Sequence, residues 1–246
     1  MTVPWLLCRV RRPDAALRMY CLPHSGGSAG EFLHWADELP DMEVWGVQPP
    51  GRGQRLDEEP FTAMADLVHA IVDEVEFEPP YVLFGHSLGA AVEYEVAREL
   101  HLRGKALPLR LYVSAHEAPH LHVGDPTLVT LDDNGLLAEL EAQYGPLPPE
   151  LRDDPDWRSL VLDCLRADLR IVADYRADRP ATPLPCPIVA VGGADDDVPE
   201  PDLAAWADHT SGDFTHRLFP GGHFYFREHN REFLDFLASA GTRAAR

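Results

Sequence analysis

The stretch YVLFGHSLGAAV, at residues 81–92, decides the fold. It opens with an apolar run typical of a buried strand, and the residues after its second glycine are typical of a helix. Between the two lies a G-x-S-x-G pattern formed by Gly85, Ser87 and Gly89, which in this context predicts a nucleophile elbow. The glycines keep side chains out of a tight turn, and the turn exposes the serine hydroxyl. We therefore predict that Ser87 is a nucleophile and that the N–H of Leu88 donates to an oxyanion.

The rest of the chain alternates between short apolar runs and helix-length segments. We predict further strands at 17–22, 44–47, 109–114, 186–191 and 215–219, and helices at 32–39, 64–75, 88–102 and 231–240. This alternation predicts an α/β fold, with a mostly parallel, twisted sheet flanked by helices. Residues 124–183 show helical patterns and no strand. We predict a single domain over residues 1–246, in which this segment is a helical lid inserted above the carboxyl edge of the sheet.

Composition narrows the class of protein. The chain has 246 residues, of which 45% are hydrophobic and 25% charged, as is ordinary for a globular domain. Its net charge of −20 disfavours binding to nucleic acid or to an anionic membrane. No apolar run approaches the roughly 18 residues of a membrane span. We expect a cytoplasmic protein that binds neither nucleic acid nor membrane.

A serine nucleophile needs a base and an acid that orients the base, and in this topology they follow the serine in the order acid, then histidine. His223, in PGGHF at 220–224, lies just past the last predicted strand and is the predicted base. The predicted acid is Asp195, in the turn GGADDD at 192–197. Asp196 or Asp197 remain open if this turn is one residue longer, and Glu117, after the strand at 109–114, is a further alternative.

The second donor of an oxyanion hole should come from the loop after the strand at 17–22. That loop reads PHSGG at residues 23–27, and its glycines let main chain approach a substrate closely. We assign the backbone N–H of Ser25 as this donor. A tight turn with no such role is the alternative.

A second motif points to a different chemistry. HEAPH at residues 116–120 matches H-E-x-x-H, the pattern of zinc metalloproteases. That chemistry needs both histidines on one face of a continuous helix, and Pro119 would break such a helix. We therefore predict that the chain holds no metal.

Several motifs in order carry a family resemblance, which runs from about residue 17 to residue 236. They are PHSGGS at 23–28, PPGRGQR at 49–55, GHSLGA at 85–90, SAHEAP at 114–119, LDD at 131–133 followed by RAD at 166–168, and PGGHF at 220–224. Together they resemble type II thioesterases, the stand-alone α/β-hydrolases that accompany polyketide and nonribosomal peptide synthases. The resemblance implies an α/β-hydrolase fold and an editing role, the hydrolysis of acyl groups from the phosphopantetheine arm of acyl or peptidyl carrier proteins. The triad it implies is Ser87, Asp195 and His223, and we expect a monomer without a cofactor.

Two other readings stay open at this stage. The first alternative is another serine hydrolase on the same fold, either a small-molecule carboxylesterase or a chain-terminating fatty-acyl thioesterase. The second is a catalytically silent binding protein. Docking of an acidic carrier protein on a chain of charge −20 would need a local basic patch, apolar contact or the pantetheine arm. Arg52 and Arg55 are the candidates for such a patch. The alternative is that Arg52 pairs with groups of the fold.

Overall fold

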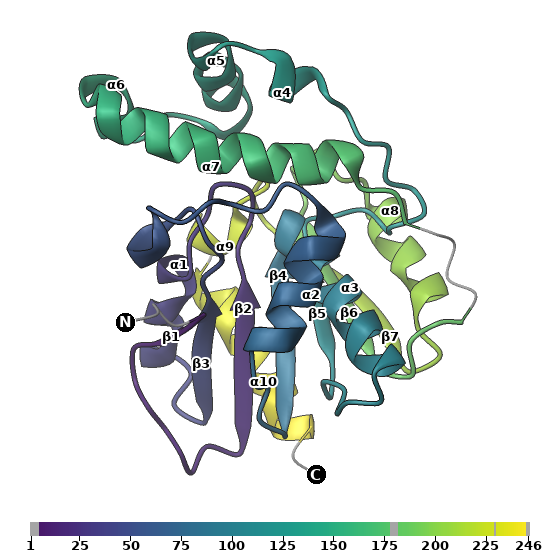
Figure 1. Ribbon diagram of the computed structural model, residues 1–246. Coiled ribbons are helices and arrows are strands. Elements are labelled where there is room, and N and C mark those ends of the chain that lie inside the picture. Colours follow the sequence, from purple (N-terminus) through teal and green to yellow (C-terminus); the bar gives the residue numbers. More distant parts are fainter. Residues whose placement is uncertain (1–4, 178–181, 229, 245–246) are drawn as a thin grey trace.

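The computed structural model describes residues 5–177, 182–228 and 230–244. A seven-stranded sheet, in the order β1-β3-β2-β4-β5-β6-β7, forms its centre (Figure 1). Every neighbouring pair is parallel except β1 and β3. The strands are β1 (Leu6–Cys8), β2 (Leu17–Leu22), β3 (Met42–Val47), β4 (Tyr81–His86), β5 (Leu111–Ser114), β6 (Ile188–Gly193) and β7 (Phe214–Phe219).

Helices cover both faces of the sheet, as expected for parallel strands. The longer helices of these two layers are α2 (Met64–Glu74), α3 (Leu88–Leu102) and α10 (Asn230–Ala244). The shorter ones are α1 (Gly30–Leu33), α8 (Glu200–Ala204) and α9 (Tyr225–Glu228), with the 3-10 helices η1 (His34–Asp37), η2 (Gly53–Arg55) and η3 (Ala205–His209).

Two apolar cores follow from the alternation of side chains along the strands. In β2, Tyr20 and Leu22 pack into the core shared with α2 and α3, whereas Met19 and Cys21 pack into the core shared with α1 and α10. Both faces of the strand are therefore buried, which explains why the strands are nearly continuous apolar runs. The predicted α/β-hydrolase fold is confirmed. β1, which the sequence patterns did not predict, pairs antiparallel with β3 at the edge of the sheet.

Four helices lie above the carboxyl ends of the strands (Figure 1). They are α4 (Thr127–Thr130), α5 (Asp133–Tyr144), α6 (Glu150–Asp153) and α7 (Pro155–Asp174), and we call them the cap. The cap has a small apolar core of its own, centred on Leu136, Leu162 and Leu165. It occupies the predicted insertion at 124–183, of which residues 178–181 lie outside the described part of the chain. No helix in the described ranges combines the length and the apolarity that crossing a membrane requires.

Candidate active site

Ser87 lies on the sharp turn between β4 and α3, with φ +55° and ψ −120°. This left-handed backbone is unusual for a residue with a side chain and is typical of strain held at functional positions. A Cβ on Gly85 would lie 2.1 Å from the carbonyl oxygen of Gly89, and one on Gly89 would lie 2.2 Å from that of Leu22. Only glycine fits at either position, so the G-x-S-x-G pattern is a packing requirement of this turn.

His223 follows β7 in the loop predicted for the base, and its ring is largely buried. Its Nδ1–H donates to a carboxylate whose two oxygens each lie 3.1 Å away, and this carboxylate belongs to Asp196. The predicted position of the acid, Asp195, is therefore wrong by one residue. Asp196 was among the alternatives that the sequence left open.

The turn after β6 explains the one-residue difference. The backbone N–H of Asp195 donates to the carbonyl of Gly221, 2.9 Å away, so Asp195 joins this turn to the histidine loop through main chain while its side chain is exposed. The next side chain points inward, and only 4% of the Asp196 side chain is exposed. Asp197 is exposed, and Glu117 contacts a different histidine, His122.

A second, buried histidine lies against the first. The rings of His86 and His223 have their centroids 4.9 Å apart. Nδ1 of His86 hydrogen-bonds Ser114 Oγ, which in turn contacts the hydroxyl of Tyr225. Burial, together with the nearby His223, lowers the pKa of His86 well below its ordinary value, so this ring is neutral.

No hydrogen bond joins the Ser87 hydroxyl to His223 among the described residues. Such a contact is often long in a resting enzyme and tightens when substrate binds. The main-chain geometry instead fixes where the serine lies, since its N–H donates to the carbonyl of Ser114, 2.8 Å away on β5.

The loop at residues 23–27, which we call the oxyanion loop, runs past the start of α3. Two of its N–H groups are already used: Gly26 N–H donates to the carboxylate of Asp168, and Gly27 N–H donates to the carbonyl of His24. The N–H of Ser25 makes no hydrogen bond within the described part of the chain. Leu88 is the first residue of α3, so its N–H has no carbonyl one turn earlier. Both predicted donors are thus available to a substrate.

The H-E-x-x-H motif does not assemble as in a zinc protease. His120 turns away and contacts buried His209, with 2.7 Å between Nδ1 and Nε2. His116, Glu117 and His122 do lie close enough to share an ion, with their ligand atoms within 4.8 Å of one another. However, the two ring nitrogens of His122 are hydrogen-bonded to the carboxylate of Glu117 at 2.6 Å and to the carbonyl of Val172 at 2.9 Å.

These bonds make His122 and Glu117 a charged pair. Burial opposes the charge on His122, but its two acceptors raise its pKa above the ordinary value. Burial likewise opposes the charge on Glu117, but the hydrogen bond with His122 lowers its pKa to about 2. A protonated imidazole has no lone pair for a metal, so this cluster favours a structural role. The absence of a metal stays a prediction.

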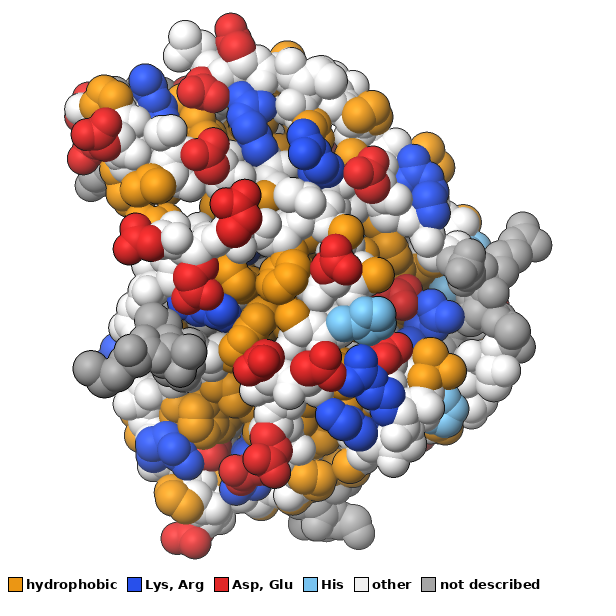
Figure 2. Space-filling model, viewed as in Figure 1, with side chains coloured by type: hydrophobic (Ala, Val, Ile, Leu, Met, Phe, Trp, Pro, Cys, Tyr) orange, Lys and Arg blue, Asp and Glu red, His pale blue; other side chains and the backbone are white. Residues whose placement is uncertain are grey.

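Arg52 and Arg55, the candidates for a docking patch, do not form one, and for Arg52 the alternative of pairing with groups of the fold is confirmed. Both are buried, with 7% of each residue exposed. Arg52 pairs with Asp168, and Arg55 pairs with Glu58 and stacks on Trp5, 4.3 Å from the ring centroid. Figure 2 shows acidic side chains spread over the face that carries α2 and α7, with basic side chains between them.

One residue near the site, on the cap, has no counterpart among the predicted site residues. Tyr144, at the end of α5 in the cap, lies over the histidine loop, with ring centroids 5.3 Å from His223 and 5.6 Å from Phe224. Although 41% of Tyr144 is exposed, desolvation of its hydroxyl, with the nearby charges of Asp196 and Asp197, raises the pKa of that hydroxyl to about 12, so it is a neutral hydrogen-bond donor. Nothing in the local sequence signals this placement, because the contact joins segments about eighty residues apart.

Known proteins that resemble this chain point to the same class of enzyme as the geometry of the site. A family model described as a thioesterase domain matches residues 18–240. The chain belongs to the thioesterase family, and it is a thioester hydrolase of the serine type.

Relatives within the family make the assignment narrower. The chain is 40% identical to "Thioesterase PikA5" of Streptomyces venezuelae, over 92% of this chain and 81% of the relative. It is 32% identical to "Gramicidin S biosynthesis protein GrsT" of Aneurinibacillus migulanus, over 91% and 88%. The solved type II thioesterase BorB, from the borrelidin biosynthetic cluster, superimposes with a TM-score of 0.86 at 34% identity and covers 100% of both chains. This chain is accordingly a type II thioesterase.

Proposed function

We propose that this thioesterase removes aberrant or stalled acyl groups from the phosphopantetheine arm of acyl or peptidyl carrier proteins, with Ser87, His223 and Asp196 as its triad. The observation that carries the triad is the hydrogen-bonded pair of His223 and buried Asp196, which lies at the same edge of the sheet as the strained elbow of Ser87. The carrier-protein substrate is supported by the similarity to thioesterases of polyketide and nonribosomal peptide pathways.

The chemistry proceeds in two halves. His223 takes the proton of Ser87 Oγ, and Oγ attacks the thioester carbonyl, while the N–H groups of Leu88 and Ser25 stabilise the oxyanion. The C–S bond then breaks, and the pantetheine thiol leaves with the proton held by His223. In the second half His223 takes a proton from water, the hydroxide attacks the acyl-enzyme, and the carboxylic acid leaves as Ser87 recovers its proton. Asp196 holds the Nδ1–H of His223, so that Nε2 is the base.

Three substrates carrying the same acyl group test this proposal: an acyl carrier protein, an acyl-N-acetylcysteamine thioester and a p-nitrophenyl ester. We expect kcat/KM to be highest for the carrier protein, and Ser87→Ala to abolish turnover of all three. A preference for the p-nitrophenyl ester would instead indicate a small-molecule carboxylesterase. Turnover by Ser87→Ala close to that of wild type would refute the nucleophile.

We also propose that the enzyme acts in the cytoplasm as a monomer that needs no cofactor. Its size in solution, measured by light scattering, tests the oligomeric state. Activity of the purified chain in buffer without additives tests the absence of a cofactor.

A further inference from the structure

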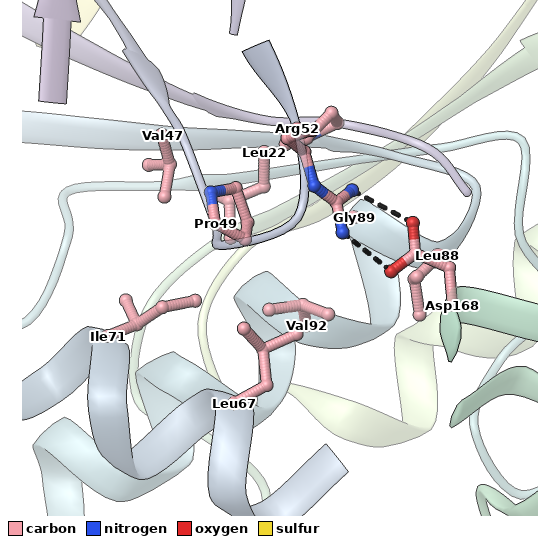
Figure 3. Close-up of a pocket in the computed structure, with 11 residues that line it drawn as sticks. Leu22, Val47, Pro49, Arg52, Leu67, Ile71, Leu88, Gly89, Val92 and Asp168 are labelled. Atoms are coloured by element: carbon pink, nitrogen blue, oxygen red, sulfur yellow. Dashed lines mark hydrogen bonds and ion pairs between the residues drawn. The ribbon is translucent and has the colours of Figure 1, made fainter. Parts of the chain in front are cut away.

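A buried ion pair joins the cap to the oxyanion loop. Asp168, on α7, receives two hydrogen bonds from the guanidinium of Arg52, which follows β3, each 2.8 Å long (Figure 3). The exposed fraction of the two side chains is 8% for Arg52 and 2% for Asp168. Arg52 also donates to the carbonyl of Gly27, 3.2 Å away. Three segments far apart in the sequence therefore meet at one charged contact.

The same carboxylate holds the main chain of the oxyanion loop. Oδ2 of Asp168 accepts the N–H of Gly26 at 2.8 Å, in addition to one N–H of Arg52. Gly26 adopts a left-handed backbone, with φ +71°, and Leu165 of α7 lies 3.2 Å from where its Cβ would be. The helix thus fixes Gly26 through a hydrogen bond, and Leu165 leaves little room for a side chain at this position. Gly26 directly follows Ser25, whose N–H has no hydrogen-bond partner in the described part of the chain.

Stability alone does not account for this pair. A buried ion pair costs desolvation energy, and well-packed apolar residues of similar size are often as stable or more stable. The surroundings would accept such residues, because Leu22, Val47, Leu67, Ile71 and Val92 line an apolar cavity beside the pair (Figure 3). What apolar residues could not supply is an acceptor for Gly26 N–H and a donor to Gly27.

We propose that Asp168 is a positioning residue for the oxyanion hole: with Arg52 as its counter-ion, it sets the main chain at residues 26–27 so that Ser25 N–H points at the developing oxyanion. In this view α7 is a fixed part of the catalytic apparatus and acts through the oxyanion loop. The inference deepens the proposed function and rests on it, since it takes Ser25 as an oxyanion donor.

The test replaces the pair by apolar residues. In the double variant Arg52→Met with Asp168→Leu, no charge is left unpaired, so we expect a melting temperature close to that of wild type. We expect kcat on an acyl-N-acetylcysteamine thioester to fall about 10- to 100-fold, because a donor is displaced and not removed. KM should change little. Inhibition by a trifluoromethyl ketone, which forms an oxyanion on the enzyme, should weaken by a similar factor.

A conservative variant covers the case in which the double variant fails to fold. In Asp168→Asn, the amide oxygen at the position of Oδ2 can still accept from Gly26 and Arg52, whereas the NH2 at the position of Oδ1 faces the guanidinium. Asp168→Asn should therefore lose stability but retain more of kcat than Asp168→Leu does.

The outcomes separate the inference from the proposed function. A double variant that melts like wild type and keeps wild-type kcat and inhibitor affinity would overturn the positioning role. So would equal losses of kcat in Asp168→Asn and Asp168→Leu. If wild type does not hydrolyse the thioester, or if Ser87→Ala remains active, the proposed function itself fails.

Discussion

The identity of the triad acid is the sharpest prediction, because three aspartates stand side by side and the structure selects one of them. Only Asp196 brings its carboxylate to Nδ1 of His223, with both oxygens 3.1 Å away. The change Asp196→Asn keeps the shape of this side chain but replaces one acceptor oxygen by an NH2 donor. An NH2 facing Nδ1 favours the tautomer that carries its proton on Nε2, and that tautomer cannot accept the proton of Ser87.

The expected loss follows from this geometry. A wrong tautomer at a triad histidine lowers kcat by about 10⁴-fold. Since each factor of ten corresponds to about 1.36 kcal/mol, this loss is about 5.4 kcal/mol of transition-state stabilisation. Asp195 and Asp197 are exposed, so Asp195→Asn and Asp197→Asn should each change kcat by no more than about twofold.

The assay follows thiol release from an acyl-N-acetylcysteamine thioester under saturating substrate. Thermal unfolding of each variant checks that a loss of kcat is not a loss of fold, which matters because Asp196 is buried. A crippled Asp195→Asn beside an active Asp196→Asn would refute the assignment. A crippled Glu117→Gln with wild-type melting behaviour would move the acid to the segment after β5.

Three further predictions concern the cap, the histidine cluster and the encounter with substrate. Tyr144→Ala should open space over His223 and raise kcat/KM for branched or bulky acyl groups relative to short linear ones, as a panel of thioesters would show. Leu137→Ala, at a partly buried residue that packs against the apolar core of the cap, should lower the melting temperature instead. The stabilisation from the charge on His122 is fully present below the ordinary histidine pKa and is lost as the pH rises through the raised pKa of His122. His122→Gln should therefore lower the melting temperature more at about pH 6 than at about pH 9, and equal losses would contradict the charged pair. Chelators should leave kcat unchanged. With a net charge of −20, moderate salt should raise kcat/KM for acidic carrier proteins and leave N-acetylcysteamine thioesters unaffected.

The sequence predicted the elements whose signals are local. The helix expected at 88–102 begins and ends as α3 does, because a strained serine turn fixes its start and Gly104, with φ +63°, lies just past its end. β1 was missed because three residues are too few to show a period of two, and because its pairing with β3 is decided by the rest of the sheet.

The acid could be placed within one turn but not at one residue. Asp195 and Asp196 are the same residue type in the same short turn, so the sequence does not distinguish them. In the structure they differ because the N–H of Asp195 donates to the carbonyl of Gly221, 26 residues further along the chain. With this bond in place, the side chain of Asp195 is exposed and the side chain of Asp196 is buried against His223. Which aspartate faces the histidine therefore depends on the loop that follows β7, and the residues at 192–197 alone cannot predict it.

The same limit left the role of Arg52 open, and the contact that decides it changes how the cap should be understood. The sequence allowed Arg52 to be a docking cation or a partner for groups of the fold. It could not decide between them, because the carboxylate that buries Arg52 lies 116 residues away on α7. The sequence predicts only that the insertion is a helical lid above the carboxyl edge of the sheet. In the structure α7 is tied to the oxyanion loop by Asp168 and to the segment after β5 by the bond from His122 to Val172. Adjustment to different acyl groups should therefore take place in α5, where Tyr144 lies over His223 without a hydrogen bond in the described residues, and not in the helix that holds the oxyanion loop in place.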